Sequence, residues 1–294
     1  MYFMTFDTAK SALDLLKKNL ILYVPDLFYT VLNYLLIYLL YLYTGAGDAL
    51  AIITTAETLP LDLLQAYVTE NLAKLIISSL VFVIVTFIIG VGVAVMKFSI
   101  ITNMLKKKKS SLYYIFIKKK GFFWPIVLMR MYVFLISLVA VVIIGALSGA
   151  VFLLFKLTMP LLAIAATSVI AVLSTIVLLI LVKLAILFRY PIMFLDKEKN
   201  ALKVLKKSFN LFKNKSMFVL ITMLIILAIN IVMAVIAWGV GFLSNFSISF
   251  INIVWLSITL GVIVGIINLL IDLTAELWGS VYIFLRYKPR KNRK

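Results

Sequence analysis

Long runs of apolar residues, separated by short polar stretches, dominate the chain. A helix needs about 20 mainly apolar residues to cross the hydrocarbon core of a bilayer. Six stretches meet this requirement: roughly residues 20–44, 75–96, 126–155, 158–188, 217–243 and 254–285. The pattern predicts an all-α, polytopic transmembrane bundle of six spans. We expect residues 1–294 to form a single membrane domain.

Lysine-rich amphipathic segments precede some of these spans. Residues 7–18 resemble residues 196–207, with identities at Asp7/Asp196, Lys10/Lys199, Ala12/Ala201, Leu13/Leu202, Leu16/Leu205, Lys17/Lys206 and Lys18/Lys207. An aspartate at the start suits a helix N-cap, because it accepts bonds from unpaired backbone N–H groups. Leu202, Leu205 and Phe209 then form an apolar stripe opposite the lysines, which predicts a helix lying in the headgroup plane.

A weaker third copy of this segment lies between the other two. The aligned pairs are Pro25/Pro125, Ser11/Ser111, Leu16/Phe116 and Lys18/Lys118. Each copy is followed by two spans, so the chain reads as three repeats of an interfacial helix plus a helical hairpin, over roughly residues 1–100, 101–190 and 191–294. Chance similarity between lysine-rich segments is the alternative, and it weighs most for the middle copy.

The basic residues fix an expected orientation. The chain has 29 Lys and Arg against 11 Asp and Glu, for a net charge of +18, and all the basic residues except Lys74, Lys156 and Lys183 fall on one side of the six-span topology. Short cytoplasmic loops retain Lys and Arg during insertion. We therefore expect a cell-membrane protein with both termini cytoplasmic. Residues 45–74 should face outside, with 59–75 as a short helix on the outer surface.

The same charges argue for lipid rather than nucleic acid as the partner. All of them border membrane spans, where each basic residue near the surface gains about 1 kcal/mol from anionic headgroups. We expect membrane lipids, bound through anionic headgroups at the cytoplasmic face, and no nucleic acid. The sequence does not predict the oligomeric state.

Composition excludes a soluble protein and most catalytic chemistry. The chain is 65% hydrophobic with a mean hydropathy of +1.17, whereas soluble domains run at roughly 45–50% apolar. It has no cysteine and no histidine, which removes disulfides, thiolate metal sites and the usual general base. We expect a non-enzymatic protein with no catalytic residue, cofactor or metal.

A polar stripe in the last predicted span is the candidate site. Asp272 and Glu276 lie four residues apart and share a helical face with Asn268. An ionisable group inside a membrane span is a functional hypothesis by default. The alternative is a buried packing contact, in which Asp272 is protonated or pairs with Lys183 or Arg130.

The segment between the fourth and fifth spans resembles a known group. The positions that carry the resemblance are Pro191, Asp196, Ala201, Leu202 and Ser208, together with Tyr282-Ile-Phe-Leu-Arg286 in the last span. They resemble an uncharacterised group of six-helix integral membrane proteins. That group is related to the membrane domain of some glycerophosphodiester phosphodiesterases and to the YciC-like families. The resemblance implies a six-helix fold and no chemistry.

Two functions remain open at this point. The first is binding or moving a lipid-like or other hydrophobic molecule. The alternative is a structural or accessory subunit that scaffolds a membrane complex through its basic cytoplasmic face. An ion-coupled transporter is disfavoured, because such proteins prefer inverted repeats with broken helices, and the copies here lie on the same side.

Overall fold

The computed structural model describes residues 3–47, 61–106, 120–156, 160–248 and 254–291, and within these ranges it contains helices and no strand. The all-α prediction is confirmed. The elements are α1 (Phe3–Lys18), η1 (Leu20–Leu22), α2 (Tyr23–Thr44), α4 (Leu61–Leu105), η2 (Lys120–Phe122), α6 (Phe123–Lys156), α7 (Pro160–Ile186), α8 (Arg189–Leu195), α9 (Ala201–Asn214), α10 (Ser216–Ile248) and α11 (Val254–Lys291).

Six of these helices are long and apolar enough to cross a membrane: α2, α4, α6, α7, α10 and α11. They coincide with the six predicted stretches. Most of their large apolar side chains remain exposed on the protein surface. Because a contiguous apolar surface of this extent is not stable in water, the chain is a multi-pass membrane protein.

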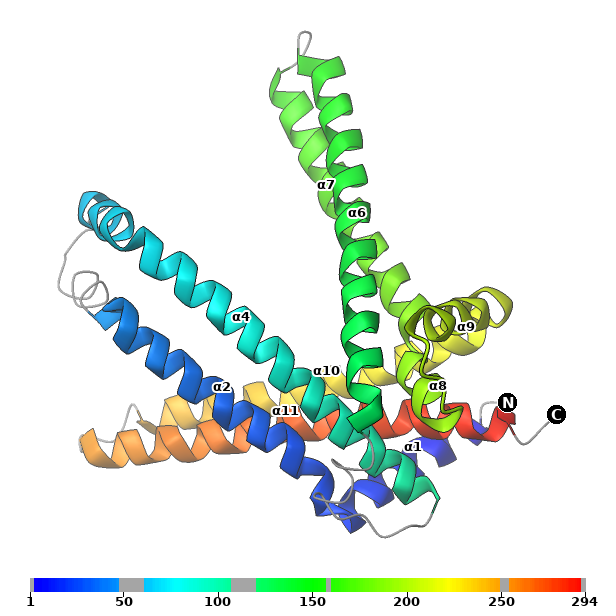
Figure 1. Ribbon diagram of the computed structural model, residues 1–294. Coiled ribbons are helices and arrows are strands. Elements are labelled where there is room, and N and C mark those ends of the chain that lie inside the picture. The colour runs from blue at the N-terminus through cyan, green and yellow to red at the C-terminus, as the bar shows by residue number, and fades with distance from the viewer. Residues whose placement is uncertain (1–2, 48–60, 107–119, 157–159, 249–253, 292–294) are drawn as a thin grey trace.

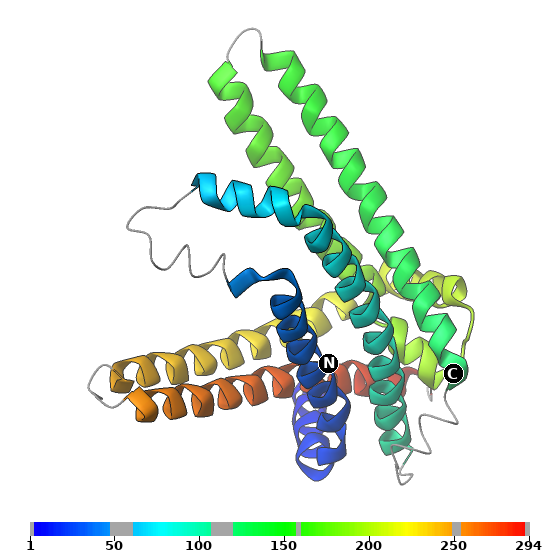
Figure 2. The ribbon, with the colours of Figure 1, turned by 60° about the vertical axis from the view of Figure 1, so that its left-hand side comes forward.

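Helix α4 corrects one prediction about the outer surface. The segment 59–75 was expected to form a separate short helix, but from Leu61 onward it belongs to one helix of 45 residues. No proline or glycine interrupts residues 61–89, so nothing in the sequence ends the helix before the span begins. Its first turns bend toward the end of α2 (Figure 2), where the Tyr67 hydroxyl donates a hydrogen bond to the Thr44 carbonyl at 2.8 Å.

The six long helices pack in pairs. The pairs α2/α4, α6/α7 and α10/α11 form three hairpins, which fan out from a common base (Figure 1). The helices α1, α8 and α9 lie at that base. The hairpins diverge with distance from the base, so contacts between them concentrate there.

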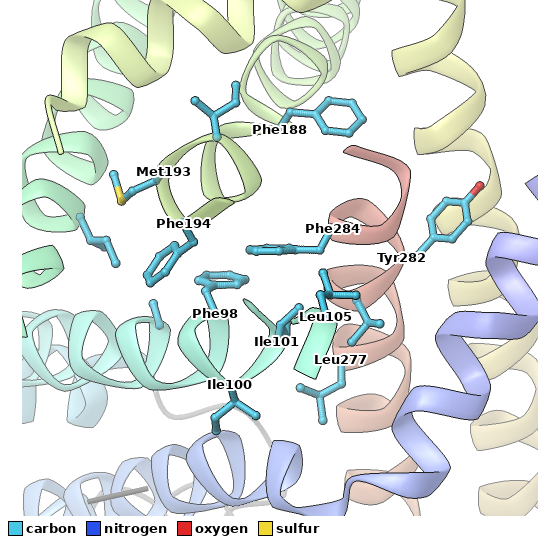
Figure 3. Packing of buried hydrophobic residues seen from close by; sticks show 14 of the residues in the cluster. Phe98, Ile100, Ile101, Leu105, Phe188, Met193, Phe194, Leu277, Tyr282 and Phe284 are labelled. Atoms are coloured by element: carbon cyan, nitrogen blue, oxygen red, sulfur yellow. The ribbon is translucent and has the colours of Figure 1, made fainter. Parts of the chain in front are cut away.

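An aromatic cluster fills the base. The Phe98 ring of α4 stacks on Tyr190 at 4.0 Å and on Phe284 at 5.6 Å between ring centroids. The Phe194 ring lies 5.9 Å from that of Phe98, and Phe284 lies on the other side of the same cluster (Figure 3). Phe194 also stacks on Phe122, at 4.8 Å between ring centroids. Such pairs add about 0.5–1.5 kcal/mol each beyond the burial of their area. Because these rings come from α4, α11, α8 and η2, the turn that leads directly into α6, the cluster holds the hairpins together.

The predicted aspartate caps are wrong. Helix α1 begins at Phe3, so the exposed Asp7 lies inside it. Helix α9 is capped by Asn200, whose side chain accepts a hydrogen bond from the Lys203 backbone N–H at 3.0 Å. Asp196 instead accepts a hydrogen bond from the Tyr287 hydroxyl at 2.7 Å. The aspartate therefore ties α11 to the loop before α9, and it is too far from Ala201 to cap that helix.

Helix α1 packs on the third hairpin rather than beneath its own. Ala12 and Leu16 are fully buried, and the Trp278 indole N–H donates to the Ala9 carbonyl at 3.2 Å. Leu13, expected on the same apolar face, is 39% exposed. The contact with α11 fixes the start of the chain against its last span.

Helix α9 is amphipathic, but its buried face differs from the predicted stripe. Ala201, Val204 and Ser208 are buried, and Leu205 is partly buried, whereas Leu202 and Phe209 are exposed. The Ser208 hydroxyl donates to the Ala185 carbonyl at 2.7 Å, where the last carbonyls of α7 lack helical partners. A small polar residue is needed at this contact, which spacing alone does not reveal.

The middle copy of the interfacial segment, around residues 107–118, lies outside the described residues.

Candidate functional site

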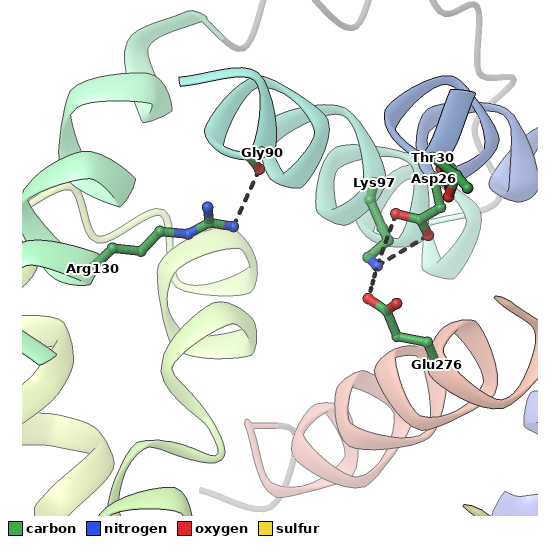
Figure 4. Close-up of polar contacts among 6 residues, drawn as sticks. All are labelled: Asp26, Thr30, Gly90, Lys97, Arg130 and Glu276. Carbon is green, nitrogen blue, oxygen red and sulfur yellow. Dashed lines mark hydrogen bonds and ion pairs between the residues drawn. The ribbon is translucent and has the colours of Figure 1, made fainter. Parts of the chain in front are cut away.

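A cluster of charged side chains joins three helices at the base. The Lys97 ammonium of α4 lies 3.0 Å from each carboxylate oxygen of Asp26, on α2, and 2.6 Å from Glu276 Oε1, on α11 (Figure 4). The Lys97 and Asp26 side chains are only 6% and 8% exposed, while that of Glu276 is 64% exposed. Lys97 thus links the first and third hairpins through charged hydrogen bonds.

Local sequence explains how Asp26 reaches this position. Pro25 and Asp26 lie in the first turn of α2, where a proline lacks only an N–H that has no helical partner. A carboxylate there is also stabilised by the positive end of the helix dipole. Thr30, one turn later, donates its hydroxyl to the Asp26 carbonyl at 2.9 Å.

A polar cavity of about 310 Å³ adjoins the charge cluster. Besides the three clustered side chains, Arg130 of α6 and Arg189 of α8 line it. The Arg130 Nη2 donates to the Gly90 carbonyl at 3.1 Å (Figure 4). Five charged side chains from all three hairpins and α8 therefore meet around one small cavity.

A second, apolar cavity of about 990 Å³ lies between the second and third hairpins. Just over half of its lining residues are leucine, isoleucine or valine, mainly from α7 and α10, and Lys183 and Asn230 are among its polar residues. The residues that line both cavities are Phe98, Arg189, Tyr190 and Glu276. The two cavities are therefore adjacent, one charged and one apolar.

The structure brings together only part of the predicted stripe. Glu276 lines both cavities, but Asp272 is exposed and lines neither. Four residues at 3.6 per turn leave an offset of about 40°, which turns Asp272 away from α4 while Glu276 meets Lys97. The Asn268 Oδ1 is buried without a hydrogen-bond partner. Asp272 and Glu276 therefore do not act at one site.

The expected charge partners take other roles. Lys183 or Arg130 was a possible partner of Asp272 in the packing alternative. Arg130 instead bonds the Gly90 carbonyl and lines the polar cavity, and Lys183 lines the apolar one. The cation that pairs with the stripe is Lys97, through Glu276.

Sequence reasoning missed Asp26 and Lys97. Asp26 lies inside the first predicted span, 20–44, and Lys97 follows the second, 75–96, by one residue. A usable signal was present: an acid and a base stand near the same-side ends of two spans expected to form a hairpin. Ionisable groups at such depth are rarely left unpaired.

No family model, curated protein or solved structure matches the chain. The resemblance to the six-helix group stays a prediction. Any functional conclusion therefore depends on the charge cluster and the two cavities themselves.

Proposed function

We propose that this membrane protein binds or moves a lipid-like or other hydrophobic molecule and catalyses no reaction. The observation that carries the proposal is the apolar cavity that adjoins a charged one at the base of the hairpins. An amphiphile has the same division, with an apolar part and a polar end. The volume of the apolar cavity lies at the upper end of the roughly 300–1,000 Å³ typical of small-molecule sites.

The polar end of the ligand must supply most of the selectivity. Lipid tails are as apolar as leucine, so moving a hydrocarbon chain from the membrane into the apolar cavity gains little free energy. Hydrogen bonds to charged groups inside a low-dielectric site are stronger, at about 1.5–3 kcal/mol each. The apolar cavity accommodates the hydrocarbon part of the ligand, and the charged cavity distinguishes between different polar ends.

Filling the apolar cavity should abolish ligand retention. Leu227 lines that cavity, and Leu227→Trp would occupy space that the ligand requires. Native mass spectrometry should show a stoichiometric hydrophobic ligand on the wild-type protein and a loss of at least about tenfold for the variant, the effect of about 1.4 kcal/mol. Leu147→Trp is the control, because Leu147 is 64% exposed and outside the cavity. A variant that retains the ligand as wild type does would contradict the proposal.

We infer that the base lies on the cytoplasmic side of the cell membrane, with both termini on that side. The support is the concentration of Lys and Arg at the base. The chain lacks cysteine, so thiol labelling of a variant with one introduced cysteine reports only on that position. Lys74→Cys should react with an impermeant thiol reagent in intact cells, and Lys203→Cys only after permeabilisation; both side chains are exposed. Labelling at residue 203 in intact cells would contradict this orientation.

We also propose that the fold derives from three repeats. Helix α9 packs mainly on α6 and α7, the hairpin that precedes it, and to a smaller extent on α10, while α1 packs on α11 of the last hairpin. If the last hairpin is counted as the one before the first unit, each of these two helices contacts the hairpin that precedes it. Repeated units would share this arrangement. Membership of the six-helix group that the sequence resembles would agree with this arrangement.

The scaffolding alternative has one observation in its favour. Helix α9 and the residue after it expose Lys203, Lys206, Lys207, Lys213 and Lys215. Such a face suits anionic headgroups, at about 1 kcal/mol per basic residue, or an acidic protein surface. A stoichiometric protein partner in the native mass spectrum, with no small ligand, would favour this alternative over ligand binding.

A further inference from the structure

We infer that the polar cavity binds the phosphodiester group of an anionic phospholipid, with Arg130 and Arg189 as its ligands. The inference rests on the proposed function and deepens it, because it names the ligand class. The occupant's acyl chains would extend into the apolar cavity.

Charge balance points to a singly charged anion. Lys97, Arg130 and Arg189 supply three positive charges around the polar cavity, and Asp26 and Glu276 supply two negative ones. One positive charge is left over. Lys97 contacts both carboxylates, so the excess resides at the two arginines. A phosphodiester carries a single negative charge and would neutralise it.

The arginines have donors to spare. The Nε of Arg189 is buried and has no hydrogen-bond partner, and a buried donor without an acceptor destabilises the protein unless a ligand accepts from it. Arg130 bonds a neutral carbonyl of Gly90. The Arg189 guanidinium carbon lies over the Tyr190 ring, 4.8 Å from its centroid. Two guanidinium groups therefore line one cavity, and the donors of a guanidinium group match the oxygens of a phosphate.

The position of these donors fits an amphiphile rather than a free ion. Arg189 and Tyr190 line both cavities, so a phosphate bound there stands at the junction. Phe98 stacks on Tyr190 at 4.0 Å and fixes the phenol. Glu276 lies at the same junction, and its carboxylate would repel a second negative charge. This disfavours a phosphomonoester and favours a phosphodiester.

The test compares lipids that differ in head group but share acyl chains. Purified, delipidated protein is titrated with phosphatidylglycerol, phosphatidylcholine and phosphatidic acid, and bound lipid is measured by native mass spectrometry. Phosphatidylglycerol should bind at least about tenfold more tightly than phosphatidylcholine, because the choline cation leaves the excess positive charge of the site without a counter-charge. It should exceed phosphatidic acid by as much, because Glu276 would repel the second negative charge of a phosphomonoester. Arg130→Gln and Arg189→Gln should each weaken it by about tenfold or more, the effect of one charged hydrogen bond.

Two controls separate this site from general attraction. Lys203→Gln removes an exposed charge on α9 and should leave the preference unchanged. A side chain at Gly90 would meet Arg130 Nη1 at 3.2 Å and the Tyr29 hydroxyl at 3.4 Å, whereas nothing lies within 4 Å of the same position at Gly92. Gly90→Val should weaken phosphatidylglycerol binding, and Gly92→Val should not. If an arginine variant fails to fold, the comparison of Gly90→Val with Gly92→Val still tests the inferred phosphodiester site.

The outcomes distinguish the inference from the function on which it rests. If hydrophobic molecules bind the wild-type protein and Leu227→Trp removes them, but head group and arginine variants make no difference, the inference fails and the proposed function stands. If soluble glycerol phosphate competes with phosphatidylglycerol at equal concentration, the cavity binds a free phosphate ester, which also overturns the inference. If the wild-type protein binds no hydrophobic ligand at all, both the inference and the proposed function are overturned.

Discussion

Replacing Lys97 with methionine is expected to destabilise the protein by about 3–5 kcal/mol, because it leaves a buried carboxylate without its cation. The Asp26 side chain is 8% exposed, and both of its oxygens bond the Lys97 ammonium at 3.0 Å. The change also releases Glu276 from α4. Unfolding in SDS titrations of the detergent-purified protein measures the loss directly.

A second substitution should reverse much of that loss. In the Lys97→Met, Asp26→Asn double variant no buried charge is left unpaired, and replacing buried ion pairs by neutral groups is often tolerated. Lys207→Met is the control, because Lys207 is 50% exposed and its partner Glu198 is only partly buried, and no measurable change is expected. A single Lys97→Met variant as stable as wild type would refute the structural role of the cluster.

Phe98→Ala is expected to cost about 3–5 kcal/mol, the range for removing a buried aromatic ring. Phe98 is 7% exposed and contacts the rings of Tyr190, Phe194 and Phe284. These residues belong to α8 and α11 as well as α4, so the hairpins should separate more readily. The same SDS titration reports the change in unfolding free energy.

The matched control for Phe98 is another phenylalanine on a long helix. Phe134 of α6 is 59% exposed, so Phe134→Ala removes a ring that faces lipid and leaves no cavity. Its effect should be much smaller than that of Phe98→Ala. Equal losses for the two variants would mean that the aromatic cluster does not hold the base together.

The apolar pattern predicted the spans because their length is set by the bilayer. It did not predict where the second span begins, since residues 61–75 carry polar side chains yet contain no residue that stops a helix. It also could not predict which faces meet. Lipid-facing and core-facing positions are both apolar, so Phe98 and Phe134 look alike in sequence although one is buried.

The site was harder to predict, because its members are distant in sequence. Lys97 lies 71 residues from Asp26 and 179 residues from Glu276 along the chain. Only the way the hairpins meet at the base brings them together. The stripe in the last span correctly drew attention to Glu276, but nothing local distinguishes it from Asp272, since both are acids on one face of one helix.

The most direct measurement of ligand binding between the hairpins is photo-crosslinking with phosphatidylglycerol that carries a diazirine in one acyl chain. One labelled lipid per protein is reconstituted in nanodiscs, and the modified peptides are identified by mass spectrometry. We predict adducts concentrated on residues of α7 and α10 that line the apolar cavity, such as Ile180 and Leu227, with the Ile180 adduct lost in Leu227→Trp. Adducts spread equally over exposed positions such as Tyr38 of α2, and unchanged by Leu227→Trp, would contradict it.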